Sequence, residues 1–493
     1  MKKSLYCGGG FFDNQLLWII PIIDGYCEAN KVKTIIFERK LSNRLLKNTH
    51  ISSILKNYHI LNLKDNISFI QLLNIIIFFF RNCFKIIYYS LIINRKIILN
   101  KNLSWKKIQI YHSIWDTSFF YVKDGNLNPN FFHKFKSSLR IFMNIYFAYY
   151  LKKKKIFTAI MNHSVYSART MIAIFRESDI KIIIQANHSL YLLPLLFDNS
   201  WSIFDKKTLI KLRKKKILES SISYWKGRLK GHGNYEDAKI AFNKKNYKKN
   251  YHTFNNIIFL HIFRDSPFNV IDRQRIFSDY VDWIDKTLRI LKYSKEDWII
   301  RPHPNFKRWG ENSYKTYKEI LNKIANNNDL KNVKYLNDKI PNIDLLKKAK
   351  RILTFSGTVH VEAACLGIKP IVISDCTLSN SSSGRFVFKP KNLNQYKNLL
   401  LSNSNSSIFK LNNRQRRESI FMLFIRESIV SLRKELGAIS IYRSDSDKIR
   451  DCEFNNIYKN LDKKKYFLKE TGKSLGRVTR NAISQKYLKY FIK

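Results

Sequence analysis

The sequence predicts an α/β protein made of two domains, each built on a parallel β-sheet. In two separate stretches, short apolar runs typical of buried strands alternate with longer segments of helical periodicity. The chain also has 493 residues, which is more than one hydrophobic core usually serves. Hydrophobic residues make up 45% of the chain, which is enough for two cores and argues against wholesale disorder.

The first stretch begins at the N-terminus. Ser4–Cys7 is a short apolar run, glycines follow at positions 8–10, and helical periodicity extends from Asp13 to Asn30. Pro21 is expected to kink or divide that helix. A second strand is expected at Thr34–Phe37. This strand–helix–strand order predicts parallel pairing.

The rest of the first domain follows an apolar insertion at residues 67–98. Strands are expected at residues 108–111, 156–161 and 181–184, and helices at 135–152 and from Tyr166 onward.

A polar, lysine-rich stretch over residues 208–255 is expected to be the domain junction. After it, strands are expected at residues 257–261, 298–301, 351–355 and 370–373, and helices at 277–292, 314–326, 343–348 and 359–366. Beyond about residue 405 the chain reads as helical and basic. The predicted organisation is therefore an N-terminal domain at 1–250, a C-terminal domain at 255–405 and a helical extension at 406–493.

The formal net charge is +52. Such a charge favours an anionic partner, either a nucleic acid or an acidic membrane surface. A coding bias toward Lys, Asn and Ile is the simpler explanation of the charge, because lysines occur along the whole chain rather than in one stripe. Even so, the charge would help the protein to rest on an anionic inner leaflet.

The cysteines and the N-terminus bear on location. The six cysteines form no CxxC pair and no zinc-ligand spacing, which favours a reducing compartment. The N-terminal MKKSLYCGGGFFDNQ lacks the apolar core and cleavage site of a signal peptide. We therefore expect a cytoplasmic protein.

Residues 67–98 form the most apolar stretch, but Arg81 and Lys85 interrupt it. A spanning helix needs about 20 consecutive apolar residues, so an interfacial or partly buried helix fits better. Two alternatives remain open: peripheral contact with the inner membrane face, or a helical pair packed on the first domain.

The densest motif is ILTFSGTVHVEAACLGIKPIVIS, from Ile352 to Ser374. An expected strand leads into Ser356, Gly357 and Thr358, and a helix follows. A helix N-terminus carries N–H groups suited to a diphosphate. Glu362 lies one turn up that helix, where a carboxylate can accept hydrogen bonds from ribose hydroxyls. Ordinary N-capping and helix-end charge pairing are the simpler alternatives.

The segment WIIRPHPN precedes this motif by one strand–helix unit. Arg301 and His303 lie where an expected strand ends, and the flanking prolines restrict the backbone. A guanidinium can bind phosphate through two hydrogen bonds, and an imidazole can donate to phosphate or move a proton. A plain surface turn is the alternative.

Other polar residues are expected just beyond strand ends, at the edge where ligands bind in open parallel sheets. In the second domain these are His261 and Asp265. In the first they are Gly9 and Gly10 of the glycine run, Asp116 and His163. Any one of them alone could be a satisfied loop or capping residue, but together they mark one edge of a sheet.

From Leu103 to Ser374 the chain resembles capsule and surface-polysaccharide glycosyltransferases of the GT-B fold, a group that includes bacterial Kdo transferases and polyglycerolphosphate polymerases. The matching segments are HIFRDSP, WIIRPHPN and TFSGTVHVEAACLGIKPIV in the second domain, with IYHSIWDTS and NHSVYSARTMIAIFRESDIKIII in the first. The resemblance implies two facing Rossmann-like domains, with the donor nucleotide in the C-terminal one and the acceptor mostly in the N-terminal one. Residues 67–98 and the tail after Asn405 match nothing in that group.

The expected function is transfer of a sugar from a nucleotide-sugar donor to a saccharide or lipid-linked acceptor. Expected donor-site residues are Gly9, Gly10, Arg301, His303, Ser356, Gly357, Thr358 and Glu362, and candidate catalytic residues are Asp116, His163, His261 and Asp265. Neither domain carries a DxD metal motif, so neither a metal nor a separate cofactor is expected. Three alternatives remain: glycerophosphate transfer from a CDP donor on the same fold, a nucleic-acid-binding protein, which no motif supports, and a non-catalytic scaffold of an export complex.

Overall fold

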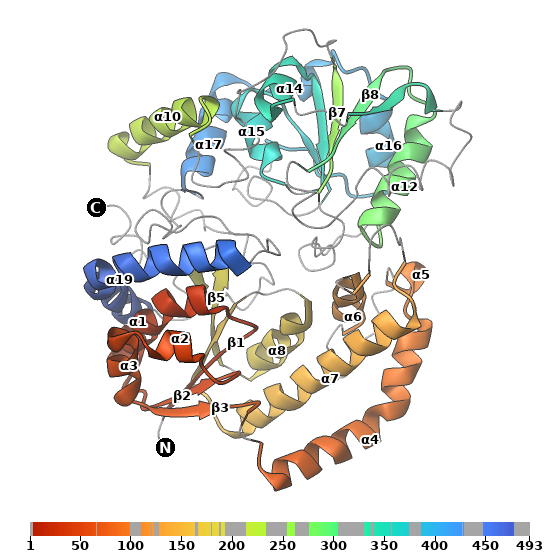
Figure 1. The fold of residues 1–493 in the computed structure, drawn as a ribbon. Helices are drawn as coiled ribbons and strands as arrows, with labels where there is room; N and C mark the ends of the chain where they lie inside the picture. Colours follow the sequence, from red (N-terminus) through yellow and green to blue (C-terminus); the bar gives the residue numbers. More distant parts are fainter. Residues whose placement is uncertain are drawn as a thin grey trace.

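The chain folds into two α/β units, each with its own central sheet (Figure 1). The structure is a computed structural model. It describes residues 3–65, 67–98, 110–119, 121–122, 128–162, 166–178, 180–186, 189–192, 213–232, 254–261, 276–303, 330–336, 340–355, 357–373, 386–425, 427 and 447–477.

The sheet of the first unit has the strand order β3-β2-β1-β4-β5-β6. Its strands are β1 (Ser4–Gly8), β2 (Thr34–Phe37), β3 (His59–Asn62), β4 (Thr158–Met161), β5 (Lys181–Ala186) and β6 (Ser189–Leu192). All neighbours pair in parallel except β5 and β6. The order 3-2-1-4-5 along the parallel strands is that of a Rossmann-like sheet, with its topological switch point between β1 and β4.

Helices cover this sheet and extend beyond it. They are α1 (Asp13–Asn30), α2 (Asn43–Leu46), α3 (Thr49–Lys56), α4 (Phe69–Ile92), α5 (Arg95–Ile98), α6 (Ile110–Phe119), α7 (Phe131–Lys153) and α8 (Tyr166–Glu177). Helix α1 continues through Pro21, so the expected division of that helix is wrong. The strand expected at residues 108–111 is also wrong, because Ile110 and Tyr111 begin α6. Helix α6 contacts both α7 and α8, which explains why nearly all of its residues are buried.

The second unit repeats the same sheet order. Its sheet runs β11-β10-β7-β8-β9, with every pair parallel. The strands are β7 (Asn256–Phe259), β8 (Trp298–Arg301), β9 (Val333–Tyr335), β10 (Arg351–Thr354) and β11 (Ile371–Val372). Counted from β7, this is again 3-2-1-4-5, so the switch point lies between β7 and β10. Two Rossmann-like units in one chain are the architecture of the GT-B fold, and the predicted fold class is confirmed.

The helices packed on the second sheet include one from within the expected junction. They are α10 (Lys215–Leu229), α12 (Tyr280–Leu291), α14 (Asn342–Lys348), α15 (Val359–Cys365), α16 (Leu393–Leu401) and α17 (Asn413–Phe424), with a short 3₁₀ helix at Ser407–Phe409. Trp225 of α10 shares a buried cluster with Val361 and Phe421. Helix α10 therefore packs with the second unit, although a division at residue 250 assigns it to the first. The helix expected at 314–326 lies outside the described residues.

The C-terminal part does not form a separate extension. Helix α17 packs on α15 and α10, whereas α19 (Asp447–Gly476) returns to the first unit and lies along α1 (Figure 1). The two helices approach closely at Gly25 and Gly472. A Cβ on Gly25 would lie only 1.8 Å from the Lys469 carbonyl oxygen. Phe454 and Leu468 of α19 belong to the same core as the apolar face of α1.

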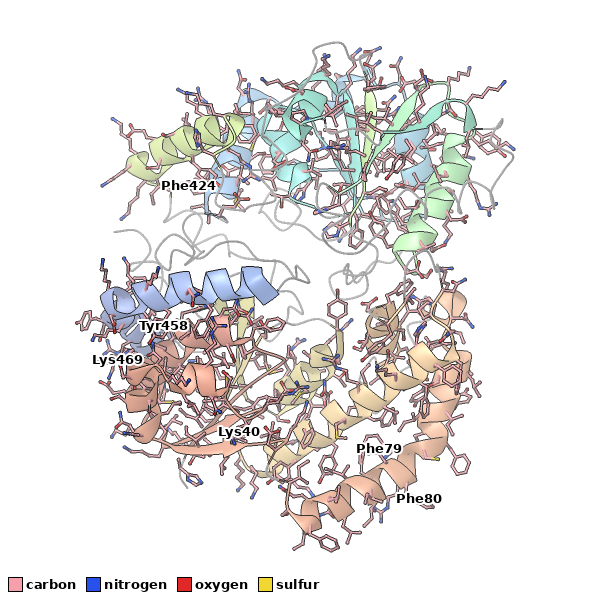
Figure 2. The ribbon with its side chains drawn as sticks, in the orientation of Figure 1. Lys40, Phe79, Phe80, Phe424, Tyr458 and Lys469 are labelled. Atoms are coloured by element: carbon pink, nitrogen blue, oxygen red, sulfur yellow. The ribbon has the colours of Figure 1, made fainter. Side chains whose placement is uncertain are left out.

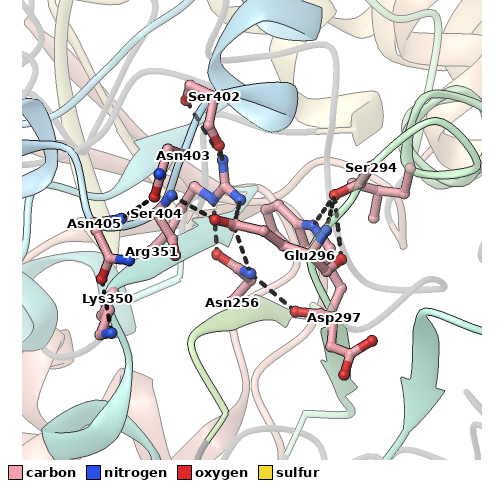
Figure 3. A network of polar contacts seen from close by, with 12 residues as sticks. Asn256, Ser294, Glu296, Asp297, Lys350, Arg351, Ser402, Asn403, Ser404 and Asn405 are labelled. Carbon is pink, nitrogen blue, oxygen red and sulfur yellow. Dashed lines mark hydrogen bonds and ion pairs between the residues drawn. The ribbon is translucent and has the colours of Figure 1, made fainter.

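A polar network fixes the amino-terminal edge of the second sheet (Figure 3). Arg351, which opens β10, is fully buried. Its guanidinium donates to Glu296 Oε2 at 2.5 Å, to Asn256 Oδ1 at 2.9 Å and to the Ser402 carbonyl at 2.6 Å. Burial lowers the pKa of Arg351 to about 10. The network joins the starts of β7 and β10 to the end of α16. It takes no part in the opposite edge of the sheet, where the carboxyl ends of these strands lie.

Asp279 joins the two units. This buried residue caps α12, and its Oδ1 accepts the Asp282 N–H at 2.8 Å. Its Oδ2 accepts from Arg95 Nε of α5 at 2.7 Å and from Trp115 Nε1 of α6 at 3.1 Å. One carboxylate of the second unit therefore binds two donors of the first.

Candidate functional site

The second unit brings polar residues together at its topological switch point. His261 follows β7, Gly357 follows β10, and His303 follows β8 on the other side of β7. Because the three strands are parallel neighbours, their carboxyl ends meet at one edge of the sheet. This is where open α/β sheets bind their ligands.

The contacts at this edge are close. The ring centroids of His261 and His303 are 5.8 Å apart. A Cβ placed on Gly357 would lie 3.7 Å from Cδ2 of His261, so His261 lies between residues that follow the two neighbouring strands. The His261 backbone N–H donates to the Tyr280 hydroxyl of α12, and Phe355 lies against His261 with ring centroids 6.3 Å apart.

His303 is neutral at physiological pH. Its surroundings lower the pKa of its imidazole to about 3, chiefly through burial and further through the nearby His261 and Arg301. A neutral imidazole has one N–H donor and one acceptor nitrogen. It can therefore donate a hydrogen bond to a phosphate oxygen or accept a proton, but it adds no positive charge to this edge of the sheet.

Arg301 lies in β8 and is mostly buried. Its Nη2 donates to the backbone carbonyl of Ile340 at 2.8 Å. That bond ties β8 to the segment before α14. The expected phosphate contact of Arg301 stays a prediction.

Glu362 of α15 lies inside the unit rather than on its surface. Its side chain is buried, and Oε1 accepts from Arg228 of α10, with Nε at 3.2 Å. Arg228 Nη1 also donates to Glu427 at 2.5 Å. Burial raises the pKa of Glu362 and the positive charge of Arg228 opposes that rise. Two carboxylates share one guanidinium inside the unit, so the expected ribose contact has no support in this geometry.

Thr358 stands at the N-terminus of α15, where its side chain makes no capping hydrogen bond. Helix α15 has seven residues, fewer than the 359–366 expected from the sequence. Gly357 and Thr358 thus lie where predicted, at the turn from β10 into α15. Ser356 lies outside the described residues.

In the first unit the glycine run follows β1 at the switch point. Gly9 and Gly10 have φ of +91° and +82°, in the left-handed region that favours glycine. Their N–H groups donate to Glu38 Oε2 at 2.7 and 2.9 Å, and Glu38 Oε1 pairs with Lys64 at 2.5 Å. This backbone nest holds the Glu38 carboxylate, and the expected donor-site role of Gly9 and Gly10 stays a prediction.

Asn162 completes that edge. It follows β4, and its Nδ2 donates to the Gly10 carbonyl at 2.9 Å. His163, the next residue, lies outside the described residues, as does Asp265 of the second unit. Asp116 is described, but it is buried in the middle of α6, so its expected place beyond a strand end is wrong.

Sequence reasoning missed several residues of the two edges. Glu38, Lys64 and Asn162 hold the glycine run, and Tyr280 holds His261. Glu38 and Asn162 each directly follow an expected strand, so their positions at the edge could have been found. Among the described residues there is no group of three or more His, Cys, Asp or Glu side chains that could hold a metal ion.

Comparisons with known proteins give similarity in fold only. No family model matches the chain, and no curated protein matches it. One similar solved structure is the KpsC beta Kdo 2,4 transferase of Thermosulfurimonas dismutans, at 11% identity over 54% of this chain and 79% of that one, with a TM-score of 0.31.

Two further structures are similar over more of the chain. The UDP-GlcNAc 2-epimerase of Methanocaldococcus jannaschii, solved with UDP-GlcNAc and UDP, is 15% identical over 86% of this chain and 99% of that one, with a TM-score of 0.28. A glycosyltransferase from Rickettsia africae ESF-5 is 9% identical over 95% and 98%, with a TM-score of 0.26. Values this low carry no argument about activity.

Proposed function

We propose that this protein is a glycosyltransferase that takes a sugar from a nucleotide-sugar donor bound to the second unit. One observation carries the proposal: His261, His303 and Gly357 meet at the switch point of a Rossmann-ordered sheet. A crevice at that point is the general nucleotide-binding position of such sheets.

In sugar transfer, the site must stabilise the nucleoside diphosphate that leaves the donor. Negative charge grows on the phosphate oxygen as the glycosidic bond to the donor breaks. A neutral His303 that donates an N–H would stabilise that charge more in the transition state than in the ground state. The acceptor hydroxyl must lose its proton to a base, which we place in the first unit beside the glycine run. No metal is required for these steps.

The acceptor is proposed to be a growing surface polysaccharide or a lipid-linked saccharide, and the enzyme to work in the cytoplasm. The acceptor assignment rests on the resemblance of HIFRDSP, WIIRPHPN and TFSGTVHVEAACLGIKPIV to capsule-type transferases, and the location rests on the cysteine pattern and the N-terminal sequence. Neither assignment rests on a contact in the structure.

The first experiment is a thermal-shift screen with UDP, GDP, CDP and CMP. One nucleotide at about 100 times its dissociation constant should stabilise the protein by about 2.7 kcal/mol. His303→Ala should weaken that stabilisation, whereas His59→Ala should not, because His59 is an exposed residue at the start of β3. If no nucleotide stabilises the protein, or if both variants respond like the parent, the donor site is wrongly placed.

The second experiment identifies the product released from the donor. A nucleoside diphosphate indicates sugar transfer, and a nucleoside monophosphate from a CDP donor indicates glycerophosphate transfer. A CMP-sugar donor would also release a monophosphate, so the donor supplied must be stated. His303→Ala should lower turnover by about tenfold or more, since one lost transition-state hydrogen bond costs that much.

A further inference from the structure

Helix α4 presents an unusually apolar outer face. Within the described residues, α4 is the helix that is long and apolar enough to cross a membrane. Three of its phenylalanines stand in solvent, with exposed fractions of 80% for Phe69, 81% for Phe80 and 84% for Phe84. Soluble monomers rarely expose a contiguous apolar surface of this kind without a use for it.

The exposed side chains form one stripe. Successive helix residues turn by about 100°, so Phe69, Phe80 and Phe84 fall on the same side of α4, and Arg81 and Lys85 fall together on one flank of that side. Both basic residues are exposed. We call the following set the α4 face: Phe69, Ile70, Leu72, Leu73, Ile76, Ile77, Phe80, Phe84, Ile87, Tyr88 and Leu91.

The opposite side of α4 is attached to the first unit along its length. Near the start, Gln71 Nε2 donates to the Tyr150 hydroxyl at 2.5 Å, and near the end Ser90 donates to Ser138 at 3.1 Å. Between them, Phe78 packs against Tyr146 of α7. Figure 2 shows Phe80 on the outer side of α4 and Phe79 toward α7. A helix held in this way cannot also be surrounded by lipid, so it cannot span a bilayer.

Helix α4 and helix α7, on which it packs, carry charge of one sign. No acidic residue occurs between Asp65 and Asp116, nor anywhere in α7. Arg81 and Lys85 lie beside the stripe, and α7 contributes further lysines. A second copy of the chain would bring the same cations together with no acid to pair with. An anionic surface with an apolar interior fits both the stripe and its flank.

We propose that the α4 face docks the protein on an anionic lipid bilayer, with α4 lying in the plane of the membrane. The aromatic and aliphatic side chains enter the boundary between headgroups and acyl chains, and Arg81 and Lys85 extend to the headgroups. The inference does not depend on the proposed function, because docking involves no nucleotide.

The test is co-sedimentation of the full chain with phosphatidylcholine vesicles, with and without phosphatidylglycerol, in the absence of nucleotide. The parent should bind the anionic vesicles. Phe80→Asp with Phe84→Asp should weaken binding by at least about tenfold per side chain, because each loses its burial in lipid. Tyr293→Asp is the control, since Tyr293 is 70% exposed but lies in the second unit. Arg81→Gln and Lys85→Gln should each cost about fivefold on anionic vesicles only.

A second measurement tests the orientation of α4 relative to the membrane plane. In a variant whose six native cysteines are replaced by serine or alanine, spin labels on single cysteines introduced at positions 69, 80 and 91 should report equal, shallow depths, whereas a spanning helix would place position 80 deepest. Absence of binding to anionic vesicles, or binding unaffected by the double aspartate variant, would overturn the proposal. So would a dimer in light scattering that this variant dissociates, because the α4 face would then contact a second copy.

Discussion

At the scale of single residues, the buried ion pairs of the second unit should contribute strongly to its stability. Arg228 is fully enclosed and joins Glu362 of α15 to Glu427 after α17. The Tyr224 hydroxyl also bonds Glu427. Removing the guanidinium would leave two carboxylates buried without a counter-charge. We expect Arg228→Met to destabilise the protein by about 3–5 kcal/mol, measured by urea unfolding.

Glu362→Gln provides the comparison. It should cost clearly less, because Glu427 still pairs with Arg228 and the amide oxygen can still accept a hydrogen bond. Among folded molecules, nucleotide affinity should be unchanged, since the carboxylate faces Arg228 rather than the edge of the sheet. A large loss of nucleotide affinity at full stability would restore Glu362 to the donor site.

His303 predicts a dependence of stability on pH. Its folded pKa of about 3 lies below its ordinary value of 6.5, so between these values the unfolded chain binds more protons. The stability contributed by His303 is therefore complete above about pH 6.5 and is lost as the pH falls toward 3. His303→Gln should lose less stability than the parent between about pH 7 and pH 4.5 in urea titrations. Parallel curves for the two proteins would contradict the lowered pKa.

His261, His303 and Gly357 could be placed at one sheet edge from the sequence because each follows a short apolar run that predicts a strand. Parallel topology then brings the strand ends together. The buried pairing of Glu362 could not be predicted, because it depends on a residue far away along the chain. Its partner Arg228 lies 134 residues away, in a lysine-rich stretch that reads as a junction. No local pattern reveals such a partner.

At the scale of elements, α1 and α19 depend on small residues at their contact. A Cβ on Gly25 would overlap the Lys469 carbonyl, and one on Gly472 would come within 1.9 Å of the Ile22 carbonyl. Gly25→Ala should therefore force the helices apart and destabilise the protein by about 1–3 kcal/mol, measured by thermal unfolding. The backbone of the neighbouring helix, unlike a side chain, cannot move aside.

Gly227→Ala in α10 is the matched control. The nearest atom to its new Cβ would be His232 Cβ at 3.8 Å, an ordinary contact. Alanine suits a helix better than glycine by about 0.5–1 kcal/mol, so this variant should be neutral or slightly more stable. If both alanine variants behave alike, steric contact between α1 and α19 is not the cause.

Helix α6 shows why one element was misread. Alternating Ile108 and Ile110 favour a strand, but Ile114 and Trp115 continue the apolar pattern at helical spacing. With α7 and α8 around it, α6 is buried on nearly every side, and its buried polar residues, such as His112 and Asp116, leave no clear apolar period. The well-separated patterns of β1, α1 and β2 gave the right elements at almost the right residues.

At the scale of the whole molecule, the contacts of Asp279 couple the two units. We expect Arg95→Ala combined with Trp115→Phe to remove both donors while Asp279 still caps α12. Calorimetry should then show the units unfolding in two separated transitions, or more widely separated ones than in the parent, because less energy couples them. Asp285→Asn with Arg289→Gln removes an exposed ion pair on α12 and should leave the transition unchanged. An unaltered transition in the first variant would mean that other contacts couple the units.

The division into domains was predictable only in outline. The two strand–helix series predicted two units. Helix α10, however, packs on the second unit although it lies within residues 1–250, and α19 packs on the first unit although it lies within the predicted C-terminal extension. Helix assignment to a domain depends on which core accepts its apolar face. That choice is made in three dimensions, so position along the chain does not reveal it.

The return of α19 reverses the order in which the two halves can be completed during synthesis. Phe454, Ile457 and Leu461 belong to the core that also contains α1, so the half of the molecule translated first lacks part of its interior until nearly the whole chain exists. The second unit, whose described helices end with α17, can close its core earlier. On the ribosome, the half made last is therefore finished first. A nascent chain arrested before α19 would carry one complete unit and one whose α1 still exposes an apolar face to chaperones.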